Sequence, residues 1–154
     1  MKLSLIEHSG NILLNTADEM CRQSNAQRSE KAPVYGFELV LDLKDCDPSS
    51  FNRESLDDYF SQLCDLISME KAEVHFWDDV GVAPEEQQTD AHTKGTSAVC
   101  FILTSSIVIH TLDILKTVYV NIFSCKTFAP DIAAEFTKDW FHGKIQNSTF
   151  IERH

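Results

Sequence analysis

The sequence predicts an α+β domain, a two-layer sandwich in which two helices pack on one face of a mainly antiparallel sheet. Several runs of β-branched and aromatic residues have the length of strands, and two other segments repeat their apolar residues at helical spacing. In chain order these segments give one strand, a helix, four strands and a second helix. Two helices on one face of such a sheet is the economical packing of this order.

The first predicted strand and helix lie within residues 37–67. Residues 37–43 nearly alternate between apolar and polar side chains, which is typical of a strand with one face in the core. Turn and cap residues at 45–50 then end the strand. From Phe51 the apolar period changes to three and four, which predicts an amphipathic helix. The residues expected on its buried side are Leu56, Tyr59, Phe60, Leu63, Leu66 and Ile67.

Residues 72–77 (AEVHFW) predict a second strand, and an acidic segment follows it. Residues 78–94 are rich in Asp, Glu, Gln and Thr, with Gly81 and Pro84 as turn residues. A loop of this length is typical of either a functional lid or a disordered segment.

The most apolar stretch, residues 95–125, is the centre of the chain. Two strand-like runs, 98–103 and 107–111, flank the hydroxyl residues Thr104-Ser105-Ser106. Hydroxyl groups at such a junction are either satisfied by backbone groups or used chemically. A fifth strand, 118–123, comes just before Cys125.

A second helix is predicted from Pro130-Asp131, because proline is favoured in the first turn, and Gly143 ends it. No element is predicted for residues 144–154. The buried stripe expected on this helix is Ala133, Phe136, Thr137, Trp140 and Phe141.

The composition of the chain narrows the range of its possible functions. The chain has 154 residues, a net charge of −11 and five cysteines without CxxC spacing. The acidic charge argues against nucleic acids and anionic membranes and suits a cationic small molecule, although solubility alone also explains it. The cysteine pattern favours a reducing cytoplasm without disulfides or a metal site. Polar residues interrupt the run 98–123, so we expect no transmembrane helix, and the N-terminus does not resemble a signal peptide.

Two blocks of the sequence resemble the prokaryotic S-adenosylmethionine decarboxylase proenzyme family. The first block runs from Gly36 through Asp47, and the second carries four residues at the family's spacing. Ser105 falls on the serine at which the family cuts its own chain, and Ser97 and His110 fall on its second processing serine and its processing histidine. Cys125 falls on the catalytic cysteine. The resemblance implies a domain at 34–154, preceded by an N-terminal arm at 1–33.

The resemblance also implies a function. Self-cleavage between Thr104 and Ser105 leaves a pyruvoyl group on Ser105, which condenses with the amine of S-adenosylmethionine and accepts electrons when carbon dioxide leaves. Ser97 stabilises the oxyanion during cleavage, His110 shuttles protons, and Cys125 reprotonates the product. The product supplies aminopropyl groups for spermidine. A homodimer with active sites near its interface is implied as well.

Three departures from the family pattern keep alternatives open. Thr104 replaces the usual glutamate before the cleaved serine, Ser106 replaces a frequent histidine, and residues 78–94 form an acidic insertion. The same chemistry on ornithine or arginine, or an uncleaved ligand-binding homologue, are therefore the competing hypotheses.

Weaker candidates for substrate contact are Phe76, Trp77, His75 and Asp42. Core packing is the simpler expectation for Phe76, and a solvent-side position is the simpler expectation for His75.

Strand geometry raises a question about this mechanism. Residues 105 and 110 differ in parity, so they point to opposite faces of an unbroken strand. Either the chain bends near Ser105-Ser106, or cleavage frees the new N-terminus to turn.

Overall fold

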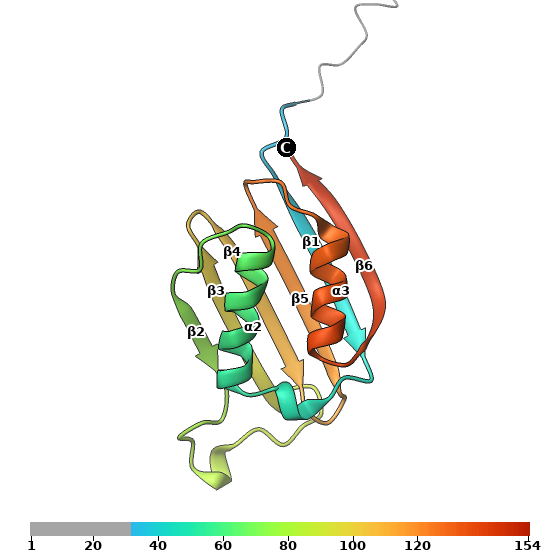
Figure 1. Cartoon of the computed structure of the whole chain (residues 1–154). Helices are drawn as coiled ribbons and strands as arrows, with labels where there is room; N and C mark the ends of the chain where they lie inside the picture. Colours follow the sequence, from blue (N-terminus) through green and yellow to red (C-terminus); the bar gives the residue numbers. More distant parts are fainter. Residues whose placement is uncertain (1–31) are drawn as a thin grey trace, which may run out of the picture. The chain divides into compact units, whose positions relative to one another are not determined.

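The computed structural model describes residues 32–154, which form one six-stranded sheet with two α-helices (Figure 1). The predicted arm lies outside the described residues apart from its last two positions. The order of strands across the sheet is β2-β3-β4-β5-β1-β6, and every neighbouring pair is antiparallel. The strands are β1 (Gly36–Lys44), β2 (Val74–Trp77), β3 (Gly95–Ile102), β4 (Ser105–Leu112), β5 (Thr117–Ser124) and β6 (Lys144–Arg153).

Both helices, α2 (Arg53–Leu66) and α3 (Pro130–Trp140), lie on the same face of the sheet (Figure 1), so the predicted fold class is confirmed. Asn52 begins α2 because its side chain accepts the backbone N–H of Ser55. The buried side of α2 differs from the prediction at one position. Leu66 is 45% exposed, and Cys64 is buried in its place.

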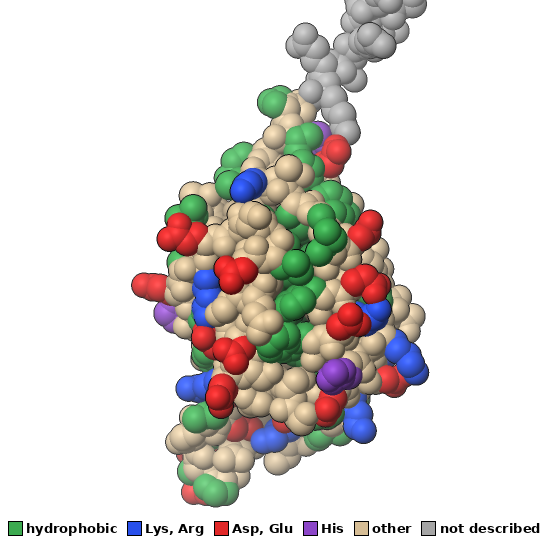
Figure 2. Space-filling model, viewed as in Figure 1, with side chains coloured by type: hydrophobic (Ala, Val, Ile, Leu, Met, Phe, Trp, Pro, Cys, Tyr) green, Lys and Arg blue, Asp and Glu red, His purple; other side chains and the backbone are tan. Residues whose placement is uncertain are grey.

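The core lies between the helices and the sheet. Tyr59 of α2 is fully buried, and its hydroxyl group shares a hydrogen bond of 2.9 Å with Thr137 Oγ1 of α3. Thr137 also donates to the carbonyl of Ala133 one turn earlier. Hydrophobic side chains line the seam between the two helices (Figure 2). The strands contribute Leu39, Leu41, Leu43, Ile107, Ile109, Val118, Val120 and Ile122.

Strand β6 is absent from the sequence prediction. It pairs with β1 along its length and forms an edge of the sheet. Its side chains are almost all exposed, which explains why residues 144–153 are polar and show no apolar alternation. The sheet therefore has one strand more than predicted.

The turn between β3 and β4 is shorter than predicted. It consists of Leu103 and Thr104, and Ser105 already pairs with Ile102 as the first residue of β4. Leu103 has a φ of 53°, in the left-handed region that side chains other than glycine rarely adopt. Such a conformation stores backbone strain of order 1 kcal/mol or more immediately before Thr104.

Neither α-helix covers the second face of the sheet, which we call the open face (Figure 1). The register places three rows of side chains across it. The first row joins Trp77, Ser97, His110, Tyr119 and Asp42, the second joins His75, Val99, Val108, Asn121 and Val40, and the third joins Phe101, Ser106, Phe123 and Glu38. The open face therefore carries both apolar residues and four of the predicted site residues, Trp77, Ser97, His110 and Asp42.

We expect Tyr59→Phe to lower the free energy of unfolding by about 1 kcal/mol, because it removes a buried hydrogen bond to Thr137. Urea denaturation at fixed protein concentration measures this change. Tyr35→Phe is the matched control, since Tyr35 is 61% exposed, and it should change stability by less than about 0.5 kcal/mol. Equal stability of the two variants would contradict a role for the Tyr59 hydroxyl group.

Candidate active site

The first part of the candidate site lies at the turn between β3 and β4, where Thr104 and Ser105 meet Cys125. The backbone N–H of Cys125 donates to Ser105 Oγ at 3.1 Å. Ser105 Oγ lies 3.7 Å from Cys125 Sγ, and Thr104 Oγ1 lies 3.2 Å from the same sulfur. We call these three residues the Ser105–Cys125 half-site. Ser105 and Cys125, the residues that the resemblance assigns to cleavage and catalysis, are therefore in contact in the uncut chain.

Contacts of Ser124, the last residue of β5, hold the backbone of Cys125. Ser124 Oγ donates to the carbonyl of Lys126 and accepts the backbone N–H of Lys126, which holds the turn after β5. On the other side, Gly36 of β1 packs so closely that a Cβ there would lie 2.5 Å from the carbonyl oxygen of Ser124. The N–H that contacts Ser105 Oγ is therefore held in place before any reaction.

The hydroxyl groups near Cys125 change its ionisation. The hydrogen bond with Thr104 is the largest cause that lowers the pKa of the Cys125 thiol, and the hydrogen bond with Ser105 adds to it. Hydrogen bonds from O–H groups stabilise a thiolate, whereas burial does the reverse. Burial raises the pKa of Cys46 to about 11. Cys125 therefore has the chemistry of a reactive thiol, and Cys46 that of a structural one.

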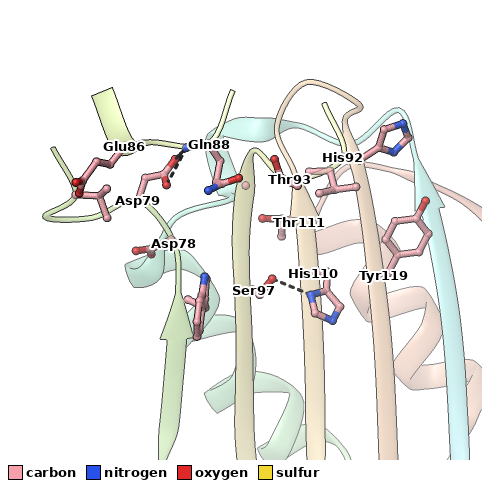
Figure 3. A pocket seen from close by; sticks show the side chains of 14 residues that line it. Asp78, Asp79, Glu86, Gln88, His92, Thr93, Ser97, His110, Thr111 and Tyr119 are labelled. Atoms are coloured by element: carbon pink, nitrogen blue, oxygen red, sulfur yellow. Dashed lines mark hydrogen bonds between the residues drawn. The ribbon is translucent and has the colours of Figure 1, made fainter. Parts of the chain in front are cut away.

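The second part of the candidate site lies on the open face. Ser97 of β3 pairs with His110 of β4, and Ser97 Oγ is 2.8 Å from His110 Nδ1 in a hydrogen bond (Figure 3). We call this pair the Ser97–His110 half-site. The hydrogen bond orients the imidazole and leaves its Nε2 without a partner within the described residues. An imidazole held in this way can accept or donate a proton at Nε2.

The structure does not bring the two half-sites together within one subunit. Ser105 is buried on the helix face of β4, whereas His110 is exposed on the open face. Five residues of regular strand also separate them by about 17 Å. Of the two possibilities raised by strand geometry, the bend near Ser105-Ser106 is absent, and Ser105 and His110 do not meet within one uncut chain. The alternation of side chains along an unbroken strand is the reason, because no bend occurs after Ser105.

A pocket of about 580 Å³ lies beside the Ser97–His110 half-site (Figure 3). Its volume is in the range of pockets that bind small molecules. The strands of the sheet supply Trp77, Ser97, His110 and Tyr119, and the acidic segment 78–94 supplies Asp78, Asp79, Glu86, Gln88 and His92. The acidic segment is therefore a wall of this pocket.

Two ion pairs hold the acidic segment: Arg53 of α2 ties it to the domain, and Lys94 joins its two ends. Arg53 binds Asp78 with two hydrogen bonds of 2.7 Å, and Lys94 binds Asp79 at 2.9 Å. These cations lower the pKa values of both carboxyl groups, so both remain ionised at neutral pH. The backbone of Gln88 also donates to Asp79. Of the two expectations for residues 78–94, the disordered segment is wrong.

The weaker candidates have different positions. Trp77 lines the pocket and is 84% exposed. Phe76 points to the helix face and packs against the core, as the simpler expectation had it. Asp42 lies in the same row of the open face as His110, two strands away, and accepts a hydrogen bond from Asn147 at 3.4 Å.

Sequence reasoning did not identify Tyr119, Asp79 or Glu86 as pocket residues. Tyr119 follows from the register, since it pairs with His110 across β4 and β5. The two carboxylates belong to the acidic insertion, whose composition gave no indication of where it folds. Such pocket residues can be identified only when the pairing of the strands and the path of segment 78–94 are known.

Within residues 32–154 no helix is long and apolar enough to cross a membrane. The same residues contain no group of three or more His, Cys, Asp or Glu side chains placed to bind a metal ion.

Comparisons with known proteins agree with the fold and with the family resemblance. The sequence profile described as S-adenosylmethionine decarboxylase matches residues 37–154, so the chain belongs to the S-adenosylmethionine decarboxylase family. It is a decarboxylase-type enzyme of that family. A crystal structure of the adenosylmethionine decarboxylase from Aquifex aeolicus VF5 is similar, with a TM-score of 0.61 and 18% identity over 79% of this chain and 92% of that chain. No curated protein sequence matches this chain.

We expect Thr104→Val to raise the pKa of Cys125, because it removes the hydroxyl group that most stabilises the thiolate. The measurement is the pH dependence of iodoacetamide labelling at Cys125, read by mass spectrometry, in a Ser105→Ala background that keeps the chain uncut. The midpoint should move to higher pH, and labelling at neutral pH should slow.

Thr104→Ser is the matched control, since it keeps the hydroxyl group and should leave the midpoint near that of the Ser105→Ala chain. Identical midpoints for the valine and serine variants would show that Thr104 does not set the ionisation of Cys125.

Proposed function

We propose that this chain is a self-processing, pyruvoyl-dependent decarboxylase of S-adenosylmethionine, cut between Thr104 and Ser105. The observation that supports this most strongly is the Ser105–Cys125 half-site. There the serine oxygen accepts a fixed backbone N–H, and the bond to be broken follows a strained Leu103 in an exposed turn. The residues around Ser105 fit the formation of a pyruvoyl group, because a hydroxyl group, a thiol and a backbone donor surround the serine side chain.

Cleavage proceeds by rearrangement of the chain itself. Ser105 Oγ attacks the carbonyl carbon of Thr104, and the amide bond becomes an ester with a free amino group on Ser105. Loss of the proton on Ser105 Cα expels the Thr104 carboxylate and leaves a dehydroalanine. Addition of one water to its tautomer releases ammonia and leaves the pyruvoyl group at the new N-terminus. Removal of the Cα proton needs a base, and His110 is the residue that we assign to it.

A pyruvoyl group supplies a carbonyl that takes up the electrons released when the substrate loses carbon dioxide.

The role of Cys125 follows from its neighbours. Cleavage consumes the Ser105 hydroxyl group and frees Thr104 as a chain end, so the two side-chain hydrogen bonds that lower the pKa of Cys125 are lost. The thiol then regains a higher pKa and holds the proton that the product carbon requires.

A second copy of the chain completes the site in this proposal. The Ser105–Cys125 half-site lies at one end of β4 and the Ser97–His110 half-site lies near the other end. Among residues 32–154 neither α-helix covers the open face, which exposes Phe101, Tyr119 and Ile151, as is typical of a surface that packs against another sheet.

The register supports one way of fitting two open faces together. If a two-fold axis runs along the row that contains Val99, Val108 and Val40, the row of His110 in one subunit faces the row of Ser106 in its partner. This arrangement places Ser97 and His110 of one subunit beside the partner's cleavage end. Because Ser105 is the first residue of β4, its new N-terminus needs to turn about only one residue to reach the open face.

The acidic wall favours one alternative substrate class. Asp78 and Asp79 are neutralised by Arg53 and Lys94, and Glu86 is the pocket carboxylate for which the described residues provide no cation. A basic amino acid such as ornithine or arginine would place its second positive charge near Glu86. Decarboxylation assays with S-adenosylmethionine, ornithine and arginine distinguish these substrates.

Intact mass spectrometry of the purified chain tests the proposal. We expect two fragments, residues 1–104 and 105–154, with the second lacking a free N-terminal amine because a pyruvoyl group caps it. Carbon dioxide should be released from carboxyl-labelled S-adenosylmethionine.

Ser105→Ala is the variant that should remain one chain, and Ser106→Ala is the matched control that should still cleave. A single full-length wild-type chain that persists after long incubation would contradict the proposal and favour an uncleaved ligand-binding protein.

A further inference from the structure

Arg53 connects three parts of the structure that surround the pocket. It is the first residue of α2, and its guanidinium group binds both carboxylate oxygens of Asp78 at 2.7 Å. The same group lies 5.7 Å from the centre of the Phe76 ring. Arg53 therefore contacts the residue before Trp77 and the residue after it.

These contacts fix the end of β2 from both sides. The Asp78 carboxylate is only 5% exposed and also accepts the backbone N–H of Val80 at 3.0 Å. A planar guanidinium that binds a carboxylate through two parallel hydrogen bonds defines a direction as well as a distance. Trp77 and the start of segment 78–94 are therefore held in one orientation beside Ser97 and His110.

The far end of the segment is fixed independently. Lys94 binds Asp79, and its carbonyl oxygen accepts the backbone N–H of Asp113 in the turn after β4. The wall of the pocket is thus attached at two points, and Arg53 provides one of them from outside the pocket, because it does not line it.

We propose that Arg53 is a positioning residue for substrate binding: acting through Asp78, it fixes Trp77 and segment 78–94 as the wall of the pocket beside His110. This inference rests on the proposed function, since it takes that pocket as the substrate site. The contacts of Arg53 are with Asp78 and Phe76 and not with Ser97, His110, Ser105 or Cys125, so it takes no direct part in the cleavage chemistry.

Two substitutions break the clamp with opposite changes in charge. Arg53→Gln leaves Asp78 negative and unpaired, whereas Asp78→Asn removes the negative charge. If Arg53 acts by position, both variants raise the KM for S-adenosylmethionine about tenfold, the kind of loss that a misplaced binding wall produces. If it acts only through charge near a cationic substrate, the two variants shift KM in opposite directions, which would overturn the inference.

Three further readouts separate positioning from general destabilisation. The fraction of chain cleaved and the kcat should remain at the wild-type level in Arg53→Gln. Arg53→Lys, which keeps the charge but loses the paired geometry, should raise KM by an intermediate amount. Lys144→Gln, which breaks the exposed ion pair with Asp45 away from the pocket, is the matched control and should leave KM unchanged.

The outcomes also distinguish this inference from the proposed function. An active, self-cleaved wild type with an unchanged KM in Arg53→Gln and Asp78→Asn overturns the positioning role alone. A parallel loss of cleavage, kcat and affinity in both variants indicates a structural role and overturns it too. A wild-type chain that neither cleaves nor decarboxylates overturns both.

Discussion

The antiparallel register of β3 and β4 is the constraint on which the rest of the structure depends. A turn of two residues pairs Ile102 with Ser105, and this pairing then places Ser97 opposite His110 at the other end of the hairpin. A shift of the register by one residue would turn every side chain of one strand to the other face. The buried Ile107 and Ile109 prevent such a shift, because it would expose both of them. Core packing therefore determines the geometry of the reactive residues.

The sequence predicted most of the fold because its apolar periods were clear. The strand at 37–43 and the helix from Phe51 were predicted within a few residues, since alternation and helical spacing are local properties. Strand β6 could not be predicted in this way, because an exposed edge strand buries almost nothing and leaves no apolar pattern. Leu66 was assigned to the core by spacing alone, and the end of α2 turns it outward.

The candidate site was predicted as a set of residues but not as an arrangement. The family spacing made Ser97, Ser105, His110 and Cys125 candidate site residues. The fold brings them together as two pairs, Ser97 with His110 and Ser105 with Cys125. The alternation of side chains along a strand predicted that Ser105 and His110 point to opposite faces unless the chain bends. The regular strand β4 places them on opposite faces. The acidic segment was recognised as unusual from its composition. Its place beside His110 depends on the contacts of Arg53 with Asp78 and of the Lys94 carbonyl with Asp113, which no local pattern reveals.

The proposed mechanism requires that two subunits share one active site, and mixing two inactive variants tests this most directly. Chains with His110→Ala keep Ser105, and chains with Ser105→Ala keep His110, so neither variant should be cut when it is alone. When the two are co-expressed, the account predicts that the His110→Ala chain is cut between Thr104 and Ser105, because its partner supplies His110. Mixed dimers in which that chain remains whole would contradict the account, as would cleavage of the His110→Ala chain by itself.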